Sequence, residues 1–314
     1  MAMDNKNFAI EINGLKKIYN FKKPNAFEAL KGIDLNIPKQ SIFGLLGANG
    51  AGKSTLINII AGLVKKTEGK VSVWGNDIDH NERNAKLSIG VVPQELILDP
   101  FFTPRETLEY QSGYYGVPKK ENCVDEILES VGLLDKADAY ARSLSGGMRR
   151  RLMIGKAMVH RPPILILDEP TAGVDVALRQ SLWKEVKKLN KAGVTIILTT
   201  HYLEEAEAMC DSLAIVNKGE IVAEGQTNEM LHKLDKKELI ILLEEDNATN
   251  FKLKGIDIKT LNKNLIKIAF KPSKINEGEI IEKIYENGLK IKSINSKEPD
   301  LEELFLELTN NDAN

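Results

Sequence analysis

The residues best suited to chemistry lie in the run Gly-Ala-Asn-Gly-Ala-Gly-Lys-Ser-Thr, which fits the pattern G-x-x-x-x-G-K-[ST]. Glycines allow the backbone to turn successive N–H groups toward phosphate oxygens. A helix expected over Thr55–Leu63 adds the positive end of its dipole beside them. Lys53 can reach the β- and γ-phosphates, and the Ser54 hydroxyl can bind Mg²⁺. The run therefore predicts a nucleoside triphosphate site, a P-loop, formed by Gly47, Ala48, Asn49, Gly50, Ala51, Gly52, Lys53, Ser54 and Thr55.

Two carboxylates, Asp168 and Glu169, follow the apolar run Ile164–Leu167. Ligand sites of parallel sheets lie at the carboxyl ends of the strands, so both side chains are expected near the triphosphate. Asp168 is suited to hold Mg²⁺, and Glu169 is the candidate general base for an attacking water. Alone, such a pair is commonly two solvated acids, but the P-loop upstream favours the functional interpretation.

A second glycine-rich element, Ser145-Gly146-Gly147, precedes a helical pattern. Ser145 would cap that helix and leave its N–H groups available to an anion. Ser-Gly-Gly is more often simply a turn into a helix, so its meaning depends on the other motifs. His201 is similar: alone it would be structural or exposed, but it ends an apolar run, Thr195–Thr200, expected to neighbour the Asp-Glu strand.

Strands and helices alternate in the part of the chain that must position these residues. Two short apolar runs, Ile164–Leu167 and Thr195–Leu198, are typical of parallel strands buried on both faces, and the amphipathic stretch Ala177–Leu189 between them completes a βαβ unit. Residues 99–160 instead carry helical patterns, which indicates a helical subdomain inserted into an α/β core. Other strand-like runs are Phe8–Ile12, Leu35–Ile37, Ile42–Leu46, Lys70–Val73, Ile89–Val92, Asp211–Val216 and Glu220–Ala223.

Composition changes near the end of this core, and we expect one domain over 1–236 and a small α+β domain over 237–314. The second domain is rich in Lys, Ile, Asn and Glu and has no glycine-rich loop. Its expected strands and helices are Leu239–Leu243, Ile256–Ile258, Leu265–Phe270, Glu277–Tyr285, Leu289–Ile294 and Leu301–Leu308.

Composition also limits the classes of function. The 314 residues are 42% hydrophobic and 28% charged, with a formal net charge of −2, which gives no electrostatic reason to expect nucleic acid as a partner. Cys123 and Cys210 have no metal-site spacing and indicate two buried thiols in a reducing, cytosolic setting. No apolar run has the roughly 20 residues that a membrane span needs. Arg149–Arg151 is expected to be a solvated helix face.

The motifs follow the order P-loop, Gln94, Leu-Ser-Gly-Gly, Asp-Glu, His201. This order resembles the ATP-binding-cassette (ABC) ATPases over residues 8–230. The resemblance implies an α/β P-loop NTPase fold, ATP and Mg²⁺ as cofactors, and ATP hydrolysis that involves Glu169, His201 and Gln94. By the same resemblance, Mg²⁺ would be bound by Ser54, Gln94 and Asp168.

The resemblance also implies that a second copy of the chain completes the site. Ser145, Gly146 and Gly147 match the signature that closes on the γ-phosphate held by the opposite copy, and Asp175 matches the D-loop beside it. Tyr19 matches the aromatic residue that stacks on adenine, with Phe27 as a rival for that role.

The residues that follow the signature, the Asp-Glu pair and His201, together with the closing run Leu301–Leu308, narrow the family resemblance and extend it over nearly the whole chain. They resemble the YadG-like ATPase subunits of bacterial ABC exporters, of the drug- and polysaccharide-export branch. This implies a separate membrane permease as partner, no nucleic acid, and a cytoplasmic location at the inner face of the membrane through that permease. The alternative is a soluble ABC ATPase acting on ribosomes or nucleic acid. Importer subunits share the core motifs, and the C-terminal domain could regulate or dimerise the ATPase.

Overall fold

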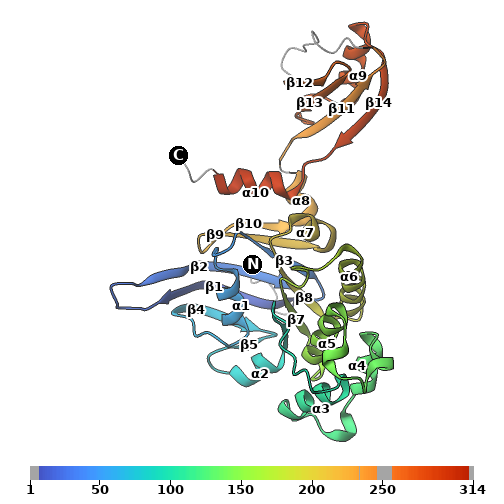
Figure 1. Ribbon diagram of the computed structural model, residues 1–314. Coiled ribbons are helices and arrows are strands. Elements are labelled where there is room, and N and C mark those ends of the chain that lie inside the picture. Colours follow the sequence, from blue (N-terminus) through green and yellow to red (C-terminus); the bar gives the residue numbers. More distant parts are fainter. Residues whose placement is uncertain (1–6, 233, 246–256, 311–314) are drawn as a thin grey trace. The chain divides into compact units, whose positions relative to one another are not determined.

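The structure is a computed structural model, and it describes residues 7–232, 234–245 and 257–310 (Figure 1). The chain forms two compact units, one ending at Gly225 and one beginning at Gln226. The sequence placed this division after residue 236. The difference arises at helix α8 (Thr227–His232), which contacts helix α10 (Leu301–Asn310) of the second unit.

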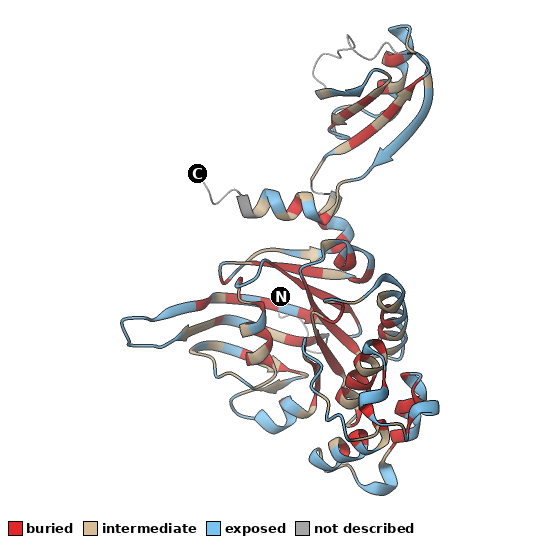
Figure 2. Cartoon of the chain, viewed as in Figure 1, coloured by how far each residue is buried: buried red, intermediate tan, exposed pale blue. Residues whose placement is uncertain are grey.

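A six-stranded sheet with the order β10-β9-β3-β8-β7-β6 forms the centre of the first unit. Its β9, β3, β8, β7 and β6 strands run parallel. Almost every residue of β3, β7 and β8 is buried, as expected for apolar strands covered on both faces (Figure 2). The strands are β3 Ile42–Leu46, β6 Ile89–Val92, β7 Ile164–Asp168, β8 Thr195–Thr200, β9 Ser212–Asn217 and β10 Glu220–Gln226.

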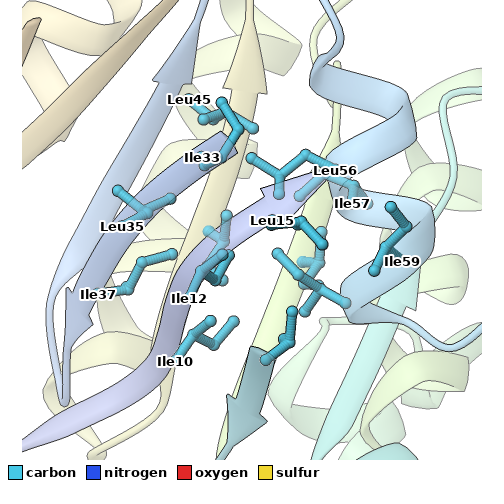
Figure 3. Packing of buried hydrophobic residues seen from close by; sticks show 14 of the residues in the cluster. Ile10, Ile12, Leu15, Ile33, Leu35, Ile37, Leu45, Leu56, Ile57 and Ile59 are labelled. Atoms are coloured by element: carbon cyan, nitrogen blue, oxygen red, sulfur yellow. The ribbon is translucent and has the colours of Figure 1, made fainter. Parts of the chain in front are cut away.

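A second sheet, with the order β2-β1-β4-β5, packs over helix α1 (Lys53–Ile60). Apolar residues of β1, β2, β3 and α1 meet in one core (Figure 3). The strands β1 and β2 are longer than the sequence predicts, because a register shift between Ile12 and Leu15 interrupts the alternation of apolar residues. The strands of this sheet are β1 Phe8–Tyr19, β2 Phe27–Pro38, β4 Glu68–Val73 and β5 Asn76–Asp77.

The predicted helical subdomain lies between β6 and β7. Thr103 and Glu106 form a capping box at the start of α3, with Pro104 as its first residue. Ser145 caps α5 and Asp175 caps α6. The helices of the first unit are α2 Glu82–Leu87, α3 Pro104–Tyr114, α4 Val124–Ser130, α5 Gly146–Met158, α6 Val176–Lys191 and α7 Leu203–Met209, with short 3₁₀ turns at Lys119–Glu121, Leu134–Lys136 and Ala141–Ser143.

The prediction that Arg149–Arg151 is a solvated helix face is wrong. Arg149 donates to the carbonyl oxygens of Leu144 and Arg142. Arg151 donates to those of Val131 and Gly132, at the end of α4, where helix carbonyls lack partners within the helix. Arg150 is buried. A run of arginines has the same sequence pattern whether it is solvated or satisfies carbonyls of neighbouring loops.

The second unit is a small α+β fold, as predicted. Its antiparallel sheet has the order β12-β13-β11-β14, and helix α9 packs Ile280 and Ile284 against the apolar face of β11 and β13. The elements are β11 Lys237–Leu243, β12 Asp257–Asn262, β13 Leu265–Phe270, α9 Glu277–Glu286 and β14 Ile291–Lys297, besides α8 and α10. Part of the predicted strand Ile256–Ile258 lies outside the described residues.

Candidate functional site

The glycine-rich loop connects the buried strand β3 to helix α1. At Gly47 a Cβ would lie 2.3 Å from the carbonyl oxygen of Val216, so a side chain cannot be placed there. Gly52, the N-cap of α1, has φ +114°, a conformation that favours glycine. The first turn of α1 carries no acidic residue, so its N–H groups and dipole are available to an anion.

Lys53 is buried, and its ammonium group donates to the carbonyl oxygens of Gly47, at 2.6 Å, and Ala48, at 3.1 Å. These bonds hold the charge over the loop. Burial lowers the pKa of Lys53, and the carboxylates of Glu169 and Asp168 act against that shift. A buried cation and two carboxylates therefore lie close enough to interact electrostatically.

A cavity of about 460 Å³ opens beside this loop. Its volume falls within the range typical of small-molecule sites. It joins P-loop residues to both Gln94 and Glu169, from segments far apart in the sequence. The residues that line it are Phe27, Ala29, Asn49, Gly50, Gly52, Lys53, Ser54, Thr55, Gln94 and Glu169.

The two aromatic candidates for adenine are neighbours. Tyr19 and Phe27 lie directly opposite each other in the β1–β2 ladder. Phe27 lines the cavity and is 61% exposed, whereas Tyr19 is 36% exposed and its hydroxyl lies 3.5 Å from Thr55 Oγ1. A stacking role for either ring stays a prediction, and the cavity favours Phe27.

Thr199, at the end of β8, holds both carboxylate residues in place. Its hydroxyl donates to Asp168 Oδ1 at 2.5 Å and accepts from the backbone N–H of Glu169 at 2.9 Å. Glu169 has φ +44°, which is costly for a residue with a side chain and common at functional sites. Thr199 was not among the residues predicted from the sequence. The available signal was a hydroxyl at the end of an apolar strand predicted to neighbour the Asp-Glu strand.

Two other predicted residues, Gln94 and His201, meet at the Glu169 carboxylate. Gln94 Nε2 donates to Glu169 Oε2 at 3.1 Å, and His201 Nδ1 lies 3.3 Å from the same oxygen. Glu169 is mostly shielded from solvent, since its side chain is 15% exposed. The carboxylate is thus oriented at the edge of the cavity, where a general base could take a proton from water.

The signature and D-loop residues lie elsewhere. Ser145, Gly146, Gly147 and Asp175 are absent from the described residues that line the cavity. Ser145 Oγ accepts from Met148 N at 3.3 Å, and Asp175 Oδ1 accepts from Leu178 N at 2.9 Å. Gly147 is buried against Leu178 of α6, while Ser145, Gly146 and Asp175 are exposed. The chain therefore presents Ser145, Gly146 and Asp175 on its surface, and none of the four residues lines its own P-loop cavity.

The predicted Mg²⁺ ligands fit the metal chemically. Ser54, Gln94 and Asp168 supply hydroxyl, amide and carboxylate oxygens, the donors that Mg²⁺ prefers. Within the described ranges, no group of three or more His, Cys, Asp or Glu side chains could hold a metal alone.

A buried acid behind the site was also missed. Glu205 of α7 accepts from Thr171 Oγ1 at 2.6 Å and pairs with Arg179 of α6 at 3.0 Å. It thereby connects the segment after Glu169 to the helix after His201. Its sequence signal was absent, because a glutamate in an amphipathic helix normally indicates a solvated face.

The chain is similar to the proteins of one known family. The profile of the family described as ABC transporter matches residues 30–172. The linearmycin resistance ATP-binding protein LnrL of Bacillus subtilis (strain 168) is 36% identical over 96% of this chain and 98% of its own length. The daunorubicin resistance ATP-binding protein DrrA3 of Streptomyces coeruleorubidus is 32% identical over 97% and 96%.

Solved structures give the same result for the first unit. The ATP-binding cassette MJ0796, solved as a dimer in a post-hydrolysis state with ADP and Pi, has a TM-score of 0.60 and 27% identity. The match covers 69% of this chain and 98% of that chain. The predicted fold class and ATPase activity are confirmed. This chain belongs to the ABC transporter family and is one of its ATP-hydrolysing subunits.

Proposed function

We propose that this chain powers an exporter whose path through the membrane is formed by a separate permease. The observation that carries the ATP-driven part of the proposal is the Glu169 carboxylate, held by Gln94 and His201 at the edge of the P-loop cavity. None of the described helices combines the length and apolar character of a membrane span. Full-length similarity to two resistance ATP-binding proteins supports export as the direction.

The residues of the cavity divide the reaction between them. The P-loop N–H groups, the α1 N-terminus and Lys53 bind the phosphates and offset charge that builds up during transfer. Ser54, Gln94 and Asp168 would hold Mg²⁺, which would neutralise further charge on the phosphates. Glu169 orients and deprotonates the attacking water, and Gln94 and His201 keep its carboxylate in position.

The site becomes complete when two copies of the chain meet. Ser145 and Gly146 are exposed, and neither they nor Gly147 line their own P-loop cavity. The Ser145 hydroxyl and the glycine N–H groups would therefore serve a γ-phosphate on the second copy. A twofold arrangement would make the two sites equivalent. A dimeric solved cassette of this family supports this arrangement.

ATP would then control the distance between the two copies. The nucleotide contacts both chains only in the closed dimer, so its binding favours closure and its hydrolysis releases it. A permease attached to both chains would change its conformation with each cycle. The chain would therefore lie at the inner face of the membrane, held there by the permease. The C-terminal α+β domain, placed by the sequence at 237–314, would be accessory to this cycle.

Purification of the tagged chain from detergent-solubilised native membranes tests the proposal. We expect an integral membrane protein to copurify in near-equal amount, and a mock purification from untagged cells to lack it. Recovery of an active ATPase with ribosomes, with DNA, or with no partner would contradict the transport role and favour the ABC ATPases that act on ribosomes or nucleic acid.

A further inference from the structure

Arg150 connects the helical subdomain to the segment that carries Gln94. It lies in helix α5 and is 6% exposed. Its Nη1 donates to the carbonyl oxygens of Pro93, at 3.1 Å, and Gln94, at 2.8 Å. Both carbonyls follow strand β6 of the central sheet, so one guanidinium joins two parts of the first unit.

The contact is made by a buried charge. Within the described residues, Arg150 forms no ion pair with a carboxylate, and burial lowers the pKa of its guanidinium. The carbonyl dipoles of Pro93 and Gln94 therefore offset the cost of burying the Arg150 charge. Hydrogen bonds to charged groups are stronger than neutral ones, and a buried charge is costly when its partners move away. Arg150 and the Gln94 backbone should consequently move together.

This contact completes a path through the chain. The Gln94 side chain donates to the catalytic carboxylate of Glu169, and its backbone carbonyl accepts from Arg150. Arg150 lies on the same helix that Ser145 caps. A change at the nucleotide that displaces Gln94 is therefore transmitted to α5, and α5 carries the signature residues at its first turn.

We propose that Arg150 is a positioning residue that couples the occupancy of one ATP site to the presentation of the same chain's signature residues, Ser145–Gly147, to the other site. The proposal rests on the nucleotide-sandwich dimer proposed above. It predicts that Arg150 affects dimer closure and turnover rather than binding of ATP to a single chain, since Arg150 does not line the P-loop cavity.

The first test uses full-length Glu169→Gln as the parent, because this change should arrest the closed dimer. Adding Arg150→Gln should raise the dissociation constant of the closed dimer in saturating MgATP roughly tenfold, within the usual range of coupling between sites. ATP affinity at protein concentrations that keep the chain monomeric should not change. Arg151→Gln is the matched control: it removes a neighbouring guanidinium that also binds two carbonyls, but those lie within the helical subdomain.

Steady-state ATPase kinetics of Arg150 variants that keep Glu169 distinguish a positioning role of Arg150 from a structural one. Arg150→Gln should lower kcat with little change in KM, and Arg150→Lys, which keeps a cationic donor, should restore part of the loss. Gln94→Ala and Arg150→Gln should lower kcat non-additively when combined, since both interrupt the same path.

Three results would overturn the inference: equal dimer formation with and without Arg150→Gln, a loss of equal size from Arg151→Gln, or strictly additive effects with Gln94→Ala. If Arg150→Gln does not fold, Arg150→Lys becomes the test variant. Wild-type kcat together with wild-type dimer formation in Arg150→Lys would then contradict the inference. A Glu169→Gln parent that stays monomeric would instead remove the proposed dimer, and this coupling with it.

Discussion

Two hydrogen bonds from one hydroxyl set the geometry of the carboxylates at the end of β7. Thr199 is fully buried, and its Oγ1 joins the side chain of Asp168 to the backbone of Glu169. Glu169 keeps a left-handed backbone conformation at this point. The position of Glu169, the proposed general base, is therefore determined by a neighbouring strand as well as by its own.

Thr199→Val should lower kcat while the protein remains folded. The substitution keeps the shape of the side chain and removes both hydrogen bonds, and bonds to charged groups contribute about 1.5–3 kcal/mol, so kcat should fall by roughly ten- to a hundredfold. Steady-state ATPase kinetics measure this. The control is Thr195→Val on the same strand, where the hydroxyl accepts from Gln40 N far from the cavity; kcat should not change there. Equal losses in the two variants would contradict the assignment.

Lys53→Ala should abolish ATP binding. The variant removes the buried cation that faces Asp168 and Glu169 and leaves phosphate charge without its principal side-chain partner. Isothermal titration with MgATP and an ATPase assay measure the result. Wild-type turnover in this variant would be incompatible with the P-loop site.

Residues predicted from motifs and residues found in the structure differ in one physical respect. Gln94, Glu169 and His201 belong to local patterns, and the structure brings them to one carboxylate oxygen. Thr199 and Arg150 act on partners distant in sequence, through a strand neighbour and through backbone carbonyls. Such contacts depend on tertiary packing, which local patterns do not specify.

At the scale of elements, burial explains what could be predicted. Strands β3 and β6 were predicted at their observed bounds, because parallel strands buried on both faces are continuous apolar runs. The antiparallel strands β1 and β2 were predicted too short, since a bulge shifts the alternation after Ile12. Helix α8 was assigned to the first domain because its polar sequence resembles a linker, whereas the compact units divide before it.

Close packing of β6 against α5 gives a prediction at this scale. A Cβ on Gly90 would lie 2.3 Å from the carbonyl oxygen of Ala157, a backbone atom that cannot move alone. Gly90→Ala should therefore destabilise the protein by about 1–3 kcal/mol through overpacking. Denaturant unfolding measures the change.

Gly113→Ala is the matched control for that substitution. Gly113 lies in α3, and a Cβ there would meet nothing within 4 Å. Because alanine favours a helix over glycine by about 0.8–1.0 kcal/mol, this variant should be at least as stable as the wild type. Equal destabilisation of both variants would show that the contact between Gly90 and Ala157 is not the cause.

At the scale of the whole molecule, each unit has a hydrophobic core of its own. The P-loop cavity is lined by residues of the first unit. Nucleotide should therefore stabilise one unit and leave the other unchanged. The stabilisation is about 2.7 kcal/mol when ATP is present at a hundred times its Kd.

Calorimetry of full-length Glu169→Gln, which should not turn over ATP, measures this directly. We expect two unfolding transitions, of which one shifts to higher temperature with MgATP while the other keeps its midpoint. A single transition that shifts as a whole would contradict the independence of the two units.

The nucleotide-sandwich dimer is tested most sharply by the mass of Glu169→Gln in saturating MgATP, measured by size-exclusion chromatography with light scattering. We expect twice the mass of one chain with MgATP, because the base is lost while every nucleotide contact remains. We expect the mass of one chain with MgADP, and also with MgATP when Lys53→Ala is added. The mass of a single chain for Glu169→Gln in saturating MgATP would contradict either the role of Glu169 or the nucleotide-sandwich dimer.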